Sequence, residues 1–332
     1  MTTPSLVVSA SPHLRAKDTT PRIMWTVAAS LAPIILAGAW FFGVSALLVI
    51  AATAAGSMMT ERVFGKSGSL WDGSAAITGV LLGLTLPAGL PLWMAALGGA
   101  FGIGFGKILF GGLGQNVFNP ALIGRAFLQA SFPVPMTTWP GVGGAFWALR
   151  GDNFAIPFTH PATIDALTAA TPLGLLKFEG QGTSLIALLF GNTAGSIGET
   201  STVIILLCGA FLAWRRLLNW RIPVAIFITT VAVSLAVGAV RPGAPGVLFM
   251  LCSGGLALGA VYMATDPVTA PVTNSGRWIF GAGIGVLVVV IRVWGGLPEG
   301  VMYAILLMNA FTPFINKATQ PRVFGTGRGR PT

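Results

Sequence analysis

The chain has 332 residues, with 19 Lys and Arg against 9 Asp and Glu, and a formal net charge of +10. Charged residues make up 8% of it and apolar residues 54%, whereas a soluble domain carries about 25% charged residues. A water-soluble globule of this size could not bury so much apolar surface, and the same composition excludes a disordered chain. Two cysteines and two histidines exclude a disulfide scaffold and a four-cysteine zinc site, and no metal site is predicted. We therefore predict an all-α polytopic membrane protein that lies in the lipid bilayer.

About ten apolar segments can be identified along the chain as transmembrane helices. A bilayer core about 30 Å thick takes about 20 apolar residues per helix. The third and fifth segments follow polar, glycine-rich stretches at 67–74 and 111–116, so we expect them to be half-helices continued by non-helical backbone. In chain order the predicted segments are 23–42, 44–60, 74–87, 92–110, 117–131, 201–214, 223–240, 247–264, 278–294 and 301–314.

The basic residues predict the orientation of these segments. Thirteen of the 19 Lys and Arg fall on one set of connecting segments and three on the other set, and cytoplasmic loops carry the excess of positive charge. Both termini are therefore expected in the cytoplasm. Since topology explains the positive charge, no nucleic-acid binding is expected. The expected parts are a cytoplasmic segment 1–22, a first bundle half 23–131, an external loop 132–200, a second bundle half 201–314 and a basic cytoplasmic tail 315–332.

Two similar stretches predict an inverted repeat. Residues 67–74 align without gaps on residues 194–201, and both are Gly-Ser turns that carry an acid and precede an apolar helix. A looser pair is formed by Asn119-Pro120 and Asp266-Pro267. The predicted topology puts the two turns on opposite sides of the membrane, which is the relation that an inverted repeat produces.

Three acids beside the predicted spans are candidates for function, because acids at membrane depth are costly and are usually functional. Asp72 and Glu199 lie in the two similar turns, and Asp266 precedes a proline. Each of them could instead cap a helix, since an acid before a helix start accepts hydrogen bonds from the first N–H groups. Both interpretations stay open at the level of the sequence.

Asn116 and Asn119 lie three residues apart, and so on one face if their segment is helical. Their amides can hydrogen-bond the edge of a heteroaromatic ring, and Arg125 could balance an anionic reduced species. The alternative is a capped half-helix in which Arg125 extends its guanidinium to the membrane interface.

The stretch from Asp165 to Thr171 contains the most specific pattern. On residue chemistry alone, Thr171 before a proline is typical of an N-cap with proline at the first helical position. However, Asp165-x-x-Thr168-Ala-Ala170-Thr171 resembles the signature at which a flavin transferase links FMN to a threonine through a phosphoester. Together with residues 67–74, 118–124 and 195–201, it makes the chain resemble the RnfD/NqrB family over residues 20–315. These proteins are membrane subunits of the Rnf complex and of the sodium-pumping NADH:quinone reductase.

The resemblance implies a covalent FMN on Thr171, with Asp165, Thr168 and Ala170 completing the attachment motif, and a flavin transferase for maturation. It also implies a second, non-covalent, riboflavin-like flavin within the membrane region. For that flavin the expected site is Asn116, Asn119 and Arg125.

The implied reaction passes electrons between reduced ferredoxin and NAD⁺, coupled to Na⁺ or H⁺ movement across a bacterial inner membrane. The chain would relay electrons rather than catalyse the reaction alone, with the flavin-bearing loop in the periplasm. Its implied partners are the other Rnf subunits RnfA, RnfB, RnfC, RnfE and RnfG. The acids expected on the ion path are Asp72, Glu199 and Asp266.

Two other functions fit the same sequence. An NqrB-like component of a quinone reductase would share the motif, although the absence of a long N-terminal extension and the Pro-Leu-Gly at 172–174 favour the RnfD type. A non-redox channel or secondary transporter would share the inverted repeat and the acids at broken helices.

Overall fold

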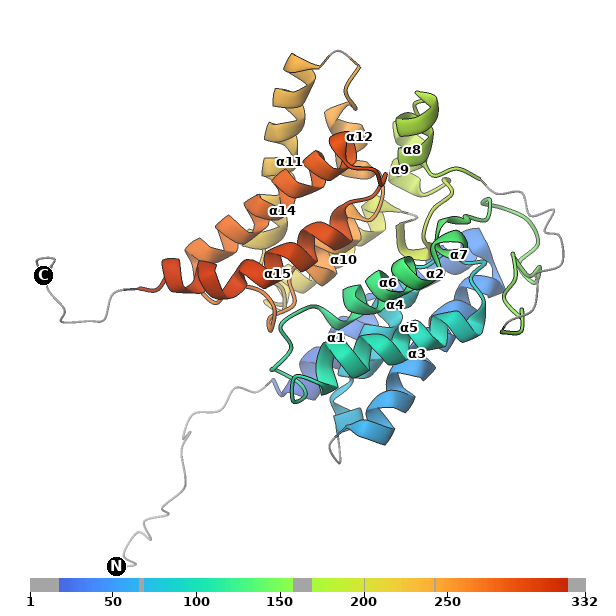
Figure 1. Cartoon of the computed structure of the whole chain (residues 1–332), viewed down its shortest axis with the longest axis vertical. Coiled ribbons are helices and arrows are strands. Elements are labelled where there is room, and N and C mark those ends of the chain that lie inside the picture. Colours follow the sequence, from blue (N-terminus) through green and yellow to red (C-terminus); the bar gives the residue numbers. More distant parts are fainter. Residues whose placement is uncertain (1–17, 66–68, 158–168, 200, 242, 322–332) are drawn as a thin grey trace, which may run out of the picture.

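The computed structural model describes residues 18–65, 69–157, 169–199, 201–241 and 243–321. Within these ranges the chain is helical and contains no β-strand. Figure 1 shows two bundles of helices, one formed by the first part of the chain in blue to green and the other by the last part in orange to red. The predicted all-α class is therefore confirmed.

The first half ends with a short helix after residue 131, and a segment of small helices links it to the second half. The first half contains α1 (Thr20–Ser30), α2 (Ala32–Phe42), α3 (Val44–Phe64), η1 (Ser69–Asp72), α4 (Ser74–Leu84), α5 (Leu92–Ile103), η2 (Gly104–Ile108), α6 (Pro120–Ser131) and α7 (Pro133–Thr137). The linking segment contains α8 (Pro172–Gly174), η3 (Leu175–Glu179), α9 (Leu185–Phe190) and η4 (Ile197–Glu199). The second half contains α10 (Thr202–Trp214), α11 (Arg221–Val240), α12 (Val247–Cys252), α13 (Leu256–Leu258), η5 (Gly259–Met263), α14 (Asn274–Trp294) and α15 (Val301–Ala318).

All ten predicted apolar segments fall on helices. Within the described ranges, four helical stretches are long and apolar enough to cross a membrane: Thr20–Phe42, Val44–Phe64, Arg221–Val240 and Asn274–Trp294. The two predicted half-helices are indeed short, because α4 has 11 residues and α6 has 12. At 1.5 Å per residue they reach about 16–18 Å, roughly half the thickness of a bilayer core.

Small residues let the long helices of the first half approach closely. A methyl group on Gly56 of α3 would lie 2.1 Å from the carbonyl oxygen of Ala96 on α5. One on Gly99 of α5 would lie 2.3 Å from the carbonyl oxygen of Thr53 on α3. Such contacts are typical of membrane helices, which gain little from apolar burial and associate through close van der Waals packing.

The two halves share one apolar core. Its fully buried members come from both halves and include Leu82, Ile197 and Leu258. Across the boundary α6 contacts α15, and α10 contacts α1 and α2. The turn η4 contacts α2, α4 and α13, so the turn that carries Glu199 lies between the halves.

The predicted repeat is reflected in the local structure of its two turns. Asp72 is the last residue of η1 just before α4, and Glu199 is the last residue of η4 just before α10. The two halves also have a similar order of helix packing. In the first half α3 packs on α5 and α5 packs on α6; in the second half α11 packs on α14 and α14 packs on α15. In this packing correspondence α4 matches α12, whereas the two similar turns match α4 with α10. The register and the inversion of the repeat therefore stay predictions.

Candidate functional site

Thr171 begins the short helix α8. Its Oγ1 accepts a hydrogen bond from the N–H of Gly174 at 3.1 Å, and Pro172 occupies the first helical position. The predicted N-cap is therefore confirmed. Because Oγ1 acts here as an acceptor, this bond does not use the hydroxyl hydrogen. Asp165 and Thr168 of the same motif lie outside the described residues, and Ala170 is exposed.

A cavity of about 850 Å³ opens beside Thr171. We call it the Thr171 cavity. Apolar side chains form most of its wall, including Met136, Trp139, Leu173, Leu188 and Met302, and its charged groups are Arg125, Glu199 and Glu299.

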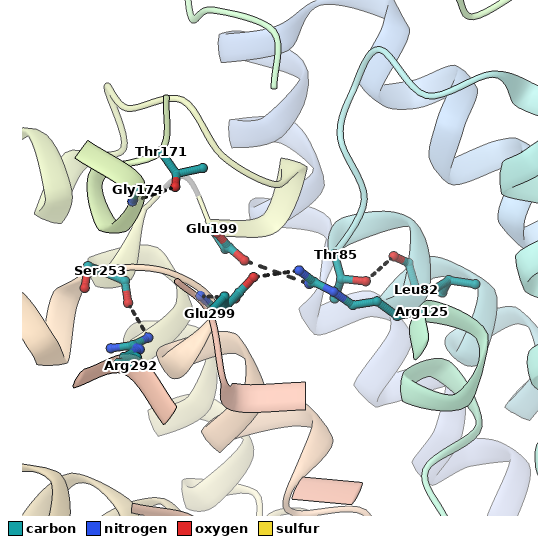
Figure 2. A network of polar contacts seen from close by, with 10 residues as sticks. Leu82, Thr85, Arg125, Thr171, Gly174, Glu199, Ser253, Arg292 and Glu299 are labelled. Carbon is teal, nitrogen blue, oxygen red and sulfur yellow. Dashed lines mark hydrogen bonds and ion pairs between the residues drawn. The ribbon is translucent and has the colours of Figure 1, made fainter. Parts of the chain in front are cut away.

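An arginine from α6 meets two carboxylates at one side of this cavity, as Figure 2 shows. Arg125 Nη2 donates to Glu299 Oε2 at 2.6 Å, whereas its Nη1 lies 4.0 Å from Glu199 Oε1. The three side chains are 9%, 20% and 10% exposed for Arg125, Glu299 and Glu199 respectively. One guanidinium therefore faces two largely buried acids, and it is bound much more tightly to Glu299.

Gly255 brings the two acids together. Its N–H donates to Glu299 Oε1 at 2.9 Å. A methyl group placed on Gly255 would lie 2.7 Å from Glu299 Oε1 and 3.0 Å from Glu199 Oε1. Both carboxylates thus occupy the space that any larger residue would need at this position.

The two acids have opposite pKa shifts, and both lie on turns outside the apolar helices. Burial, followed by the charge of Glu299, raises the pKa of Glu199 to about 8 against the opposing effect of Arg125. Burial also acts to raise the pKa of Glu299, but Arg125, the Glu199 carboxyl and the Gly255 N–H outweigh it and lower that pKa below its ordinary value. The surroundings therefore favour the ionised form of Glu299 and the protonated form of Glu199.

Lys177 connects the helical turn η3, which follows Thr171, to the C-terminal end of α14 through hydrogen bonds. Its Nζ donates to the carbonyl oxygens of Arg292, Gly295 and Leu297 at 3.2, 2.5 and 2.9 Å. A cation at the carbonyl end of a helix is favourable because the helix dipole is negative there. The contact ties the segment of Thr171 to the turn that carries Glu299.

Arg292 joins the same region from α14. Its Nη1 and Nη2 donate to the carbonyl oxygens of Met250 and Ser253 at 2.6 and 2.9 Å, where the chain breaks between α12 and α13. The side chain is buried, and the freed carbonyls of the broken helix are satisfied by it, as backbone at membrane depth requires.

A second cavity of about 900 Å³ lies between the two halves. We call it the Asn119 cavity. Asn119 caps α6 by accepting from the N–H groups of Ala121 and Leu122, and its Nδ2 donates to the carbonyl oxygen of Met263 at 3.2 Å. Asn116 Nδ2 lies 3.5 Å from Asp266 Oδ2. Asp266 and both asparagines line this cavity. Residues 116–119 are not helical and α6 begins only at Pro120, so the two asparagines do not share a helical face as the sequence suggested.

A buried ion cluster adjoins the Asn119 cavity. Lys107, in the π-helical turn η2, forms an ion pair with Glu61 of α3 and donates to Ser74 Oγ at 2.5 Å. Its Nζ also lies 3.7 Å from Asp72 Oδ2. Asp72 in turn accepts from Ser74 N–H and Oγ at 2.8 and 2.6 Å, so it binds the first residue of α4, while the N-cap position itself is Gly73.

The structure divides the predicted residues between the two cavities. Thr171, Glu199 and Arg125 belong to the Thr171 cavity, whereas Asn116, Asn119 and Asp266 line the Asn119 cavity. Arg125 does not line the cavity of the asparagines, because it lies at least one helical turn further along α6. It also does not extend to an interface, since it is buried against Glu299.

Sequence reasoning missed four charged residues: Glu61, Lys107, Arg292 and Glu299. The acids Glu61 and Glu299 lie just outside the predicted spans, in segments expected to be loops. For the two basic residues, however, the sequence did contain a signal. Lys107 and Arg292 fall within or at the ends of apolar segments, where a charge requires a partner.

The whole chain can be compared with known proteins. A model of the NQR2, RnfD, RnfE family matches residues 7–325. The chain belongs to this family. It is 42% identical to the D component of the proton-translocating ferredoxin:NAD(+) oxidoreductase complex of Clostridium ljungdahlii, an alignment that covers 97% of this chain and 96% of that protein. It is 40% identical to the D component of the Na(+)-translocating ferredoxin:NAD(+) oxidoreductase complex of Acetobacterium woodii, over 97% and 96% of the two chains.

A third member of the family, the D component of the ion-translocating oxidoreductase complex of Stutzerimonas stutzeri, is 41% identical over 95% of both chains. The predicted resemblance to the RnfD/NqrB family is therefore confirmed. As a member of this family, the chain is a subunit that contributes to a redox-driven translocase and is not catalytic alone.

Proposed function

We propose that this chain is the RnfD-type component of an ion-translocating ferredoxin:NAD⁺ oxidoreductase and carries FMN covalently on Thr171. The supporting observation is that Thr171 lines an open, largely apolar cavity and that the cap formed by its Oγ1 at Gly174 does not use the hydroxyl hydrogen. The phosphoester bond joins that oxygen to the phosphorus of the flavin nucleotide. The cap requires only an acceptor, so it holds the oxygen in place before and after attachment.

The lining of the Thr171 cavity suits an isoalloxazine ring. Trp139, Leu173 and Met302 offer apolar surface, and Arg125 offers positive charge at the wall of the same space. A bound flavin supplies electron transfer in steps of one or two electrons, while the protein positions it and sets its electrostatic surroundings. Lys177 and Pro172 contribute by fixing the segment of the attachment residue.

The Asn119 cavity is our candidate for the second, riboflavin-like flavin. Helix α6 supports the pairing of the two sites, because it begins at the Asn119 cavity and presents Arg125 to the Thr171 cavity. Six residues of α-helix span about 9 Å. Electrons passing between the two cavities would therefore travel along one short helix, and Asn116, not Arg125, would serve the inner flavin.

Asp72, Glu199 and Asp266 are the candidate stations for the transported ion. Asp266 lines the Asn119 cavity, Asp72 lies beside that cavity next to Lys107, and Glu199 lines the Thr171 cavity. An ion path through these acids would therefore follow the electron path. Relatives are named both for proton and for Na⁺ translocation. Replacing each acid by its amide should uncouple transport from electron transfer, and three variants that all pump normally would disprove this part.

In the cell, the protein would lie in the bacterial inner membrane with both termini in the cytoplasm and the Thr171 segment in the periplasm. It would assemble with RnfA, RnfB, RnfC, RnfE and RnfG and be matured by a flavin transferase. An NqrB-like role would show as reduction of quinone by the parent complex. A non-redox transporter would bear no flavin at all.

Flavin attachment can be tested directly on the purified full-length chain, produced together with the flavin transferase. Intact-mass spectrometry and in-gel fluorescence should show one FMN on the natural protein and on Thr171→Ser, and none on Thr171→Ala. Thr193→Ala is the matched control, because Thr193 lines the same cavity without lying in the motif. An unmodified mass for the natural chain, or FMN retained by Thr171→Ala, would refute the proposal.

A further inference from the structure

The carboxyl groups of Glu199 and Glu299 form a largely buried pair of acids. They approach each other across Gly255, whose absent side chain leaves the space for both Oε1 atoms. Both line the Thr171 cavity. Two carboxylates this close and this buried are unstable when both are ionised, because neither is solvated and each raises the energy of the other.

The hydrogen bonds are divided unequally between the two acids. Glu299 accepts from Arg125 at 2.6 Å and from the Gly255 N–H at 2.9 Å. Glu199 Oε1 is buried and has no hydrogen-bond partner among the described residues, and Arg125 stays 4.0 Å away from it. A buried ionised oxygen without a donor is costly, whereas a protonated carboxyl supplies its own donor.

Two other groups act on these acids. The Ser196 hydroxyl acts to lower the pKa of Glu199 against the larger effect of burial, and the charge of Arg292 lowers the pKa of Glu299, so neither reverses the order of the two pKa values in the pair. Arg292 faces the pair from α14, but both of its terminal nitrogens donate to backbone carbonyls. The positive charges therefore act mainly on Glu299, and burial without a hydrogen-bond donor to Oε1 among the described residues leaves Glu199 as the acid that favours the protonated form.

We propose that Glu199 and Glu299 bind a single proton between them and constitute the proton-binding site of the Thr171 cavity. Glu299 holds the negative charge against Arg125, and Glu199 holds the proton. The ligand is H⁺ itself, exchanged with the outside through the open cavity.

The role of this proton toward the flavin rests on the function proposed above. A flavin bound in the cavity would supply the electron-accepting chemistry, and its reduction by a reduced carrier of the complex would bring one negative charge beside the pair. The O–H bond of Glu199 would then break, its electron pair would stay on the carboxylate, and the proton would be bound by the reduced group, which balances the added charge. Proton uptake from the cavity mouth then restores the pair, so one electron and one proton enter together.

Infrared spectroscopy of the full chain in detergent tests the shared proton without any flavin. The background is Thr171→Ala with Asp266→Asn, which removes a largely buried acid that lacks a cationic partner among the described residues. In this background the carbonyl stretching band of a protonated carboxyl should be present at neutral pH and disappear as the pH rises through about 8. Glu199→Gln should remove this band. Glu299→Gln should remove it near neutral pH as well, because Arg125 then pairs with Glu199 and ionises it.

The control is Glu179→Gln, which replaces an exposed acid of the neighbouring η3 turn and should leave the band unchanged. The amide I band in the same spectra reports whether each variant is folded. A band that persists in Glu199→Gln, or that keeps its pH midpoint in Glu299→Gln, would overturn the proposal.

The flavin-bearing chain provides a separate test of the proton's role. Reduction should shift or remove the Glu199 band in the difference spectrum, and Glu179→Gln should not alter that change. If the Glu199 band does not change on reduction, the proposed link between the proton and the flavin is refuted, whereas the proposal of a shared proton is unaffected. If Thr171 bears no flavin, the proposed function fails, and the pH titration alone then decides whether the pair exists.

Discussion

Removal of Arg125 should destabilise the protein strongly, and by an amount that depends on pH. In Arg125→Gln, Glu299 loses the guanidinium that binds it at 2.6 Å and becomes a largely buried carboxylate that keeps the Gly255 N–H and the Glu199 carboxyl as partners but lacks its ion-pair partner. Breaking a buried ion pair from one side costs about 3–5 kcal/mol. The expected loss is therefore several times larger than that for a surface pair.

Protonation of Glu299 limits this loss and supplies its pH dependence. A carboxyl with an ordinary pKa of about 4.3 costs about 3.7 kcal/mol to protonate at pH 7, but only about 1 kcal/mol at pH 5. The variant can neutralise Glu299 at that cost. We therefore expect a loss of unfolding free energy of about 3–4 kcal/mol near pH 7 that falls to about 1 kcal/mol near pH 5.

Denaturant titration of the detergent-solubilised chain, followed by circular dichroism, measures this difference at the two pH values. Arg22→Gln is the matched control, because its partner Asp18 lies 3.6 Å away in an exposed pair with side-chain exposures of 63% and 53%. Such pairs contribute about 0–1 kcal/mol. A loss for Arg125→Gln that is no larger than that of the control, or equal at both pH values, would refute the reasoning.

Three further outcomes are expected. Lys177→Met should loosen the segment after Thr171, since three backbone carbonyls lose their donor, and limited proteolysis should then cut that segment faster than in the natural chain. Asn119→Ala should cost about 1 kcal/mol for the lost helix cap, measured as unfolding free energy. Because the pKa of Glu199 is raised from 4.5 to about 8 in the folded protein, its stabilising contribution is full below about pH 4.5 and is lost as the pH approaches 8. The thermal midpoint should decline across that window, and Glu199→Gln should flatten the decline.

The sequence by itself determined the architecture. Apolar runs separated by Gly, Pro and polar turns define helices because backbone groups in hydrocarbon must bond within their own segment. For this reason all ten predicted segments fall on helices, and the short α4 and α6 were expected from the polar stretches before them. The cap at Thr171 was also predictable, since it depends on a few consecutive residues and not on the fold.

Only the tertiary structure decided which charges meet. Arg125 reaches Glu299 across 174 positions of the chain, and Lys107 reaches Glu61 across 46. No periodicity or local motif encodes such pairs, because they depend on how α6 packs on α15 and α5 on α3. Burial then gives these contacts their strength, since a charge without its partner is costly only where water is excluded.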